Sequence, residues 1–197
     1  MNTTEICNLA LANIGQGTID SLDEASEPAR QCKLHYAHER RQLLGMFRWN
    51  FAERTEKLAL LAEDNIKWKY VYAYPSNALI VHSVYSEEDV DIKDMHPAEF
   101  EVYMINESVR AIGTNVPMAY CDYTADISNA AVFPEEFVEA LARKLAASIA
   151  IPLSASPEMQ KNNFQLYQGA LIGAKFHAIR QGNDRTKWPT GYTKARF

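Results

Sequence analysis

The sequence predicts an α+β fold, mainly a helical bundle of four helices with an inserted small antiparallel β-sheet lobe and an extended C-terminal tail. Near both ends of the chain, apolar residues recur three or four positions apart, which is the period of a helix. The middle of the chain instead holds short aromatic and β-branched runs separated by turn signals. We therefore expect residues 1–60 and 130–182 to form the bundle, residues 66–126 the lobe and residues 183–197 the tail.

Two helices are predicted before the lobe. Residues 4–14 are almost continuously apolar, and Gly15 is placed to end a helix in the left-handed conformation. Residues 26–46 form the second helix, because Ser26 is a favourable N-cap, Pro28 is tolerated in a first turn and apolar residues follow at helical spacing. A short helix that is apolar on most sides is expected to be buried between other elements.

Short strands are predicted in the lobe. Their connections are short, which favours one antiparallel sheet. The turn signal Pro75-Ser76-Asn77 separates the first two strands, and residues 86–98 form a loop after the second. The predicted strands are residues 68–75, 78–85, 100–105, 109–112 and 117–123.

Two helices are predicted after the lobe. The first begins at Phe133-Pro134, is rich in alanine and ends at Pro152. The second begins at Ser156-Pro157 and runs to about residue 181. Its amphipathic stripe is predicted to consist of Phe164, Tyr167, Leu171, Ala174 and Ala178.

The composition is that of an ordinary globular protein. Of the 197 residues, 47% are apolar and 23% are charged, so the chain has enough apolar surface to fold. No apolar run is long enough to span a bilayer, and Met1 to Glu5 carry no basic side chain of a secretory signal. Cys7, Cys32 and Cys121 lack the spacing of metal ligands and are predicted to be reduced, buried thiols.

Charge is distributed unevenly along the chain. The net charge of −5 argues against a generic nucleic-acid coat. Residues 80–130 hold ten acidic side chains and two basic ones, whereas residues 180–197 hold five basic side chains and one acidic one. This asymmetry indicates two surfaces with different partners, and the alternative is a solvated acidic face with an unstructured basic tail.

An acidic run lies in the loop after the second predicted strand, at Glu87, Glu88, Asp89 and Asp91. Carboxylate oxygens at alternate positions are ligands for Ca²⁺. The run lacks the glycine and the terminal bidentate glutamate of a calcium loop, so a solvated loop is the favoured interpretation.

The tail combines aromatic and basic side chains. Trp188 lies beyond any predicted element that would bury it locally. An aromatic ring among arginines is the composition of an interface anchor, and a disordered terminus is the alternative. The tail residues predicted to form such an interface are Arg185, Lys187, Trp188, Tyr192, Lys194, Arg196 and Phe197.

The sequence contains no nucleophile elbow, phosphate-binding loop or zinc-protease motif, so we expect no enzyme, no cofactor and no metal. His35 and His38 have a spacing that presents two nitrogens on one helix face, but without a nearby third ligand we favour two surface histidines. Glu99, Glu101 and Asp122 are kept as an alternative acid–base set for sugar hydrolysis.

The order and spacing of several segments carry more information than any single motif. In the first half they are Ile6 to Gly15, Ser21 to Glu24, Ala29-Arg30, Cys32, Tyr36, Arg40, Leu43-Leu44, Trp49 to Ala52, Tyr72 and Tyr74-Pro75. In the second half they are Phe133-Pro134, Phe137, Ala140 to Ala142, Leu145-Ala146, Ile149-Ala150 and Pro152 to Ser154. Together they resemble the head-to-tail adaptors, also called tail tubular proteins A, of short-tailed bacteriophages (podoviruses), over most of residues 4–180.

The resemblance implies a non-enzymatic, structural virion protein with a helical bundle and a small sheet. Proteins of this family form a homo-oligomeric ring, usually a dodecamer, between the portal protein and the tail nozzle protein. This head-tail connector closes the head after DNA packaging and conducts DNA during ejection. The implied location is the head–tail junction of the virion, assembled in the host cytoplasm, with no membrane partner.

A ring requires two different patches on each subunit, and the helices at 133–152 and 157–181 are expected to offer them. The acidic residues Glu87, Glu88, Asp89 and Asp91 are candidates to face the channel, because like charge on its wall prevents DNA from sticking. Two alternatives stay open: a phage-associated cell-wall glycosidase that uses acidic residues of the lobe, and a DNA-binding module that uses the basic tail.

Overall fold

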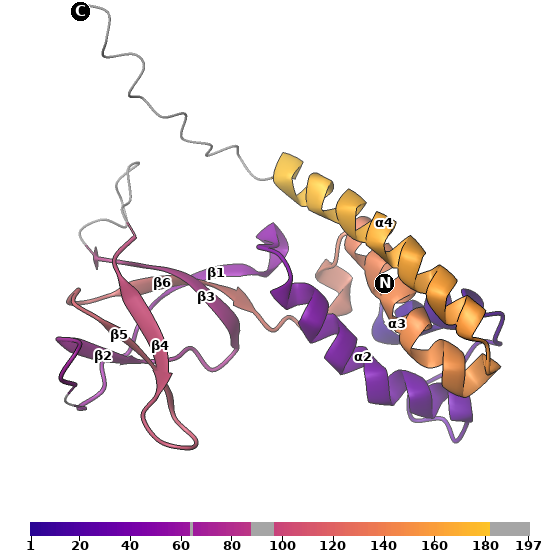
Figure 1. The fold of residues 1–197 in the computed structure, drawn as a ribbon, viewed down its shortest axis with the longest axis horizontal. Helices are drawn as coiled ribbons and strands as arrows, with labels where there is room; N and C mark the ends of the chain where they lie inside the picture. Colours follow the sequence, from indigo (N-terminus) through magenta and orange to yellow (C-terminus); the bar gives the residue numbers. More distant parts are fainter. Residues whose placement is uncertain (64, 88–96, 182–197) are drawn as a thin grey trace, which may run out of the picture. The chain divides into compact units, whose positions relative to one another are not determined.

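A computed structural model describes residues 1–63, 65–87 and 97–181 (Figure 1). The fold is α+β, with four helices and two three-stranded antiparallel sheets, which confirms the predicted fold class. The chain divides into two compact units. We call them the sheet unit, Met1–Thr3 with Lys33–Val132, and the helical unit, Thr4–Cys32 with the described part of Phe133–Phe197. The predicted tail, residues 183–197, lies outside the described residues.

The helical unit contains α1 (Thr3–Ala12), α3 (Glu135–Ser154), α4 (Pro157–Gln181) and the first residues of α2 (Glu27–Gly45). The signals that predicted the first two helices are confirmed. Gly15 follows α1 with a φ of 72°, in the left-handed region where a residue without a Cβ is favoured. The Ser26 hydroxyl accepts a hydrogen bond from the Ala29 N–H at 3.3 Å and so caps the start of α2.

Helix α3 is the core of the helical unit. Its apolar stripe of Phe137, Leu141, Leu145 and Ile149 is buried, and so are its alanines. The prediction that Pro152 ends this helix is wrong, because α3 continues to Ser154. Pro152 lies in the last turn, where it removes one helical hydrogen bond, and the Ala155 N–H closes the turn on the Ile151 carbonyl at 2.9 Å.

Hydrogen bonds from distant parts of the sequence close the helical unit. The Ser154 hydroxyl donates to the Ile14 carbonyl at 3.3 Å, and the Gln16 amide donates to the Leu153 carbonyl at 3.3 Å. The Asn163 amide of α4 donates to the Asn13 carbonyl at 3.2 Å. These contacts hold the end of α1 against the turn between α3 and α4.

The buried face of α4 differs from the predicted stripe at one position. Tyr167, Ala174 and Ala178 are buried as expected, and Leu171 is half-buried, but Phe164 is 49% exposed. The neighbouring Asn163 is buried instead, because its amide group is satisfied by hydrogen bonds to Asn13, Met159 and Arg143.

The sheet unit contains two sheets rather than the single sheet that we expected. One has the strand order β1-β6-β3 and the other β2-β5-β4. The strands are β1 (Glu53–Lys57), β2 (Tyr70–Ala73), β3 (Ala78–Tyr85), β4 (Phe100–Met104), β5 (Arg110–Thr114) and β6 (Tyr120–Ala125). The unit also holds two short 3-10 helices, η1 (Asn50–Ala52) and η3 (Ala130–Val132). Neighbouring strands in the sequence, such as β2 and β3, enter different sheets (Figure 1).

The two sheets share one apolar core. Each sheet has an inner face that supplies core residues and an outer face away from them. The core consists of Leu58, Tyr72, Val84, Ile112, Ala119, Cys121, Tyr123 and Ala125. The strand β1 was not predicted, because its residues are charged or polar throughout and its place comes from pairing with β6.

On the outer face of the β2-β5-β4 sheet, Trp68 covers Gly113. A Cβ on residue 113 would lie 2.6 Å from Cγ of Trp68, far closer than such atoms approach in proteins. The Trp68 ring is buried there, and its Nε1–H donates to Glu101 at 3.1 Å. Glycine at 113 is therefore required for the tryptophan to reach this position.

We predict that Gly113→Ala lowers the free energy of unfolding by about 1–3 kcal/mol, because the Trp68 ring must move. Denaturation in urea measures the change. The matched control is Gly169→Ala on α4, where an added Cβ meets nothing within 4 Å. That variant is expected to stabilise the helix by about 0.5–1 kcal/mol. Similar effects of the two variants would contradict this description of Trp68.

Candidate functional site

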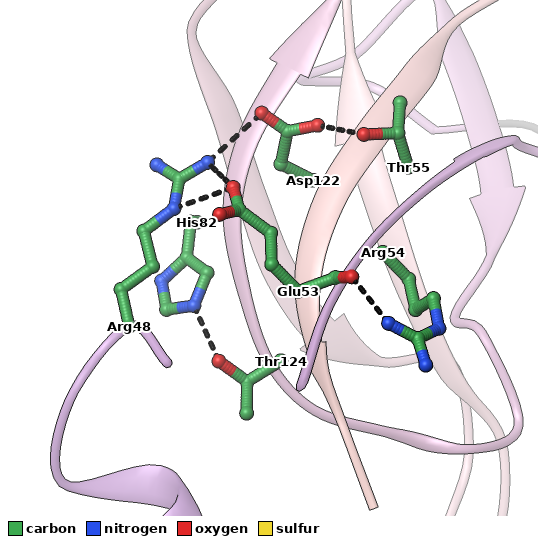
Figure 2. Close-up of polar contacts among 7 residues, drawn as sticks. All are labelled: Arg48, Glu53, Arg54, Thr55, His82, Asp122 and Thr124. Carbon is green, nitrogen blue, oxygen red and sulfur yellow. Dashed lines mark hydrogen bonds and ion pairs between the residues drawn. The ribbon is translucent and has the colours of Figure 1, made fainter. Parts of the chain in front are cut away.

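A polar cluster occupies the outer face of the β1-β6-β3 sheet (Figure 2). Side chains alternate between the two faces of a strand. Because Cys121, Tyr123 and Ala125 of β6 enter the core, Asp122 and Thr124 lie on the other face. Strand β1 adds Glu53 and Thr55 beside them, since Glu53 pairs with Thr124 and Thr55 with Asp122.

Arg48, from the connection that follows α2, holds two carboxylates of this cluster. Its guanidinium forms an ion pair with Glu53, with Nε donating at 2.7 Å, and another with Asp122 at 3.0 Å. The second oxygen of Asp122 accepts a hydrogen bond from the Thr55 hydroxyl at 2.6 Å. Both oxygens of Asp122 are therefore engaged, and Arg48 fixes the connection against the sheet.

His82 joins the cluster through an irregularity in β3. The pairing with β6 shifts between Val81 and Ser83, so His82 is the extra residue of a β-bulge. Its Nε2 lies 2.7 Å from the Thr124 hydroxyl oxygen. Burial lowers the pKa of His82 below its usual value, and the positive charge of Arg48 acts in the same direction. His82 is therefore neutral at pH 7.

The carboxylates that we considered for sugar hydrolysis are not brought together. Asp122 lies on the outer face of one sheet, whereas Glu101 of β4 pairs with Gly113 on the outer face of the other, and the shared core separates them. Lys67 and the Trp68 indole both donate to Glu101 and lower its pKa, which is the opposite of what a general acid needs. Glu99 is exposed just before β4. No observation favours the glycosidase alternative.

The histidine pair on α2 likewise gains no ligand. His38 is exposed and bonds to the Gln42 amide at 2.8 Å, while its neighbour Glu39 is buried. Within residues 1–63, 65–87 and 97–181, no group of three or more histidine, cysteine or carboxylate side chains is placed to hold a metal ion. Cys7, Cys32 and Cys121 are free and buried, as predicted.

Most of the predicted acidic and tail sites lie outside the described residues. Glu88, Asp89 and Asp91 belong to this group, as does the whole predicted tail site. The latter comprises Arg185, Lys187, Trp188, Tyr192, Lys194, Arg196 and Phe197. Glu87 is described, and it forms an ion pair with Lys57 at 2.9 Å. Its charge is therefore partly neutralised within the sheet unit.

Helices α3 and α4, which we expected to offer two subunit faces, differ in the side chains that they expose. The prediction is wrong for the alanine-rich face of α3, since Ala140, Ala142, Ala146, Ala147 and Ala150 are buried. Helix α4 instead exposes large apolar side chains on the side away from α3. The sequence carried a signal for this face, because apolar residues occur on every side of α4 and one side alone packs on α3.

Comparison of the chain with protein-family models and with curated proteins finds no match. Within the described part of the chain, no helix is long and apolar enough to cross a membrane.

We predict that Arg48→Met lowers the free energy of unfolding by about 1–2 kcal/mol, because Glu53 and Asp122 then face each other without a cation. Urea denaturation measures this change. The matched control is Arg54→Met, since Arg54 is exposed beside the cluster and donates to the carbonyls of Phe51 and Glu53. That change is expected to stay within about 0.5 kcal/mol. Equal losses in both variants would refute a special role for Arg48.

We also predict that the free energy of unfolding falls as the pH decreases from about 7 to about 5. The pKa of His82 is lower in the folded chain than in the unfolded chain. As the pH falls, the unfolded chain therefore binds a proton at His82 at a higher pH than the folded chain does, and this stabilises the unfolded chain. His82→Gln keeps a hydrogen-bonding side chain but does not titrate, and its pH dependence should be shallower. Urea denaturation at several pH values tests this, and identical slopes for both proteins would disprove it.

Proposed function

We propose that this chain is a structural protein of a short-tailed phage virion. In this proposal it forms a ring adaptor between the portal protein and the tail nozzle protein, closes the head after packaging and conducts DNA during ejection. The proposal rests on the resemblance of residues 4–180 to head-to-tail adaptors. The observation that carries it is the architecture, in which helices from both ends of the chain form one unit and a β-sheet unit is inserted between them in the sequence.

Two physical features support this function. A ring requires subunits that meet through two different surfaces, and α4 has an exposed apolar side in addition to its buried one. A DNA conduit must not bind its cargo, and the chain has a net charge of −5, which disfavours binding to phosphates. The proposed location is the head–tail junction, with assembly in the host cytoplasm.

The proposed function predicts binding to the portal protein encoded in the same genome. Sedimentation velocity of the full chain, alone and mixed with assembled portal rings, should show the chain moving with the rings. We expect Trp188→Ala to weaken this binding more than Lys194→Ala, because desolvated aromatic rings contribute more to interfaces than exposed charges do. A chain that never moves with the portal would contradict the function, and equal effects of the two variants would contradict the role of Trp188.

A further inference from the structure

The outward side of α4 carries a continuous apolar stripe. Ile172, Phe176 and Ile179 are exposed to 57%, 60% and 54%. Successive helical residues turn by about 100°, so these three side chains fall within about 60° of one another around the helix. We call them the α4 stripe. Gly169 and Gly173 lie beside it, and an added Cβ at either position would meet nothing within 4 Å.

The α4 stripe lies opposite the face that packs within the helical unit. Tyr167, Ala174 and Ala178 are buried on that inner face. A helix in a monomeric protein ordinarily places polar residues on the side away from the core. Three large apolar residues at this spacing form instead the kind of surface that a partner covers.

The charge near the stripe is positive. After Glu158, α4 contains no acidic residue, while Lys175 and Arg180, beside the stripe, are basic. The carboxylate of Glu136 on α3 is held by His177 of α4 at 2.8 Å. A contact between two α4 stripes would therefore bring like charges together. This favours a partner surface that is acidic and different from the stripe itself.

The helical unit carries such a surface at its other end. Asp20, Asp23, Glu24 and Glu27 are exposed in the segment that leads into α2. Arg30, in the first turn of α2, forms an ion pair with Glu27 at 2.5 Å, and the segment keeps a net negative charge. We call residues 20–27 the acidic loop. The start of the segment is held at the turn between α3 and α4, where Ser154 donates to the Ile14 carbonyl. The α4 stripe begins at Ile172, about 22 Å along the helix from Pro157 at 1.5 Å per residue.

From these placements we infer that the α4 stripe binds the acidic loop of a second copy of this chain. The two patches lie at opposite ends of one unit, so each copy contacts two neighbours in a head-to-tail manner. The stripe supplies the desolvated core of the contact, and Lys175 and Arg180 meet carboxylates at its rim. The contact between two copies does not depend on the proposed function. Only the closure of such contacts into a ring rests on the proposed ring adaptor.

Sedimentation velocity of the full chain, at concentrations up to about 1 mM, tests the contact without the portal. We expect association that increases with concentration and that Phe176→Ser weakens at least about tenfold. The matched control is Leu166→Ser, which removes an exposed apolar residue of α4 outside the stripe. An equal effect of the two variants, or a wild-type chain that is monomeric throughout, would overturn the inference.

A second set of variants tests the head-to-tail geometry. Asp20→Lys with Asp23→Lys should also abolish self-association, because the acidic loop then carries no net charge. Mixed with the Phe176→Ser variant, this protein should form dimers that grow no further, since one intact stripe meets one intact loop. Undiminished association of the loop variant would show that the stripe binds itself and would refute the acidic loop as its partner. Circular dichroism confirms that each variant is folded.

Deleting residues 183–197 shows whether a second copy or the tail of the same chain covers the stripe. If the stripe binds a second copy, the shortened chain associates as the full chain does. If association appears only after the deletion, the tail of the same chain occupies the stripe and the inference is wrong. A chain that binds the portal but never itself would overturn this inference and leave the proposed function intact. Self-association without portal binding would support this inference and contradict the proposed function.

Discussion

The burial of α3 is the interaction on which the helical unit depends. Its stripe of Phe137, Leu141, Leu145 and Ile149 and its alanines are almost fully inaccessible to solvent. A helix that is apolar on most of its surface is stable only when other elements cover it. The N-terminal segment meets this part of the chain directly, since Ser154 of α3 donates to the Ile14 carbonyl and Asn163 of α4 donates to the Asn13 carbonyl. The sheet unit is therefore an insertion between two segments that must meet.

The same constraint determines what α4 leaves exposed. One side of α4 is committed to α3, and small residues there, Ala174 and Ala178, are buried. The other side has no intramolecular role among the described residues, yet it carries Ile172, Phe176 and Ile179. Maintaining such a surface in a dissolved chain is costly unless a partner covers it. We therefore regard α4 as the link between the folding of one subunit and its assembly with the next.

Local signals predicted most of the helices and strands, and non-local ones were missed. Ser26 caps the start of α2 and Gly15 follows the end of α1, as expected, because caps are determined by neighbouring residues. Strand β1 and the division into two sheets depend on pairing with residues far along the chain, which spacing does not reveal. The polar cluster also depends on residues that are distant in the sequence, since Arg48 and Asp122 are 74 positions apart and His82 joins the cluster through a β-bulge. In the sequence, apolar residues occur on every side of α4, so the α4 stripe could not be distinguished from the buried face. The structure shows which side of α4 is buried.

Chemical cross-linking between copies tests the central claim, that α4 is an assembly surface, most directly. Isotopically light and heavy chains are mixed, treated with a reagent that couples a carboxylate directly to an amine, and digested for mass spectrometry. Lys175 and the acidic loop lie at opposite ends of one helical unit, so a bond between them joins two chains. We predict Lys175 joined to Asp20, Asp23 or Glu24 in peptide pairs that combine light and heavy chains. Only pairs within one chain, or Lys175 joined to other surfaces, would contradict the account.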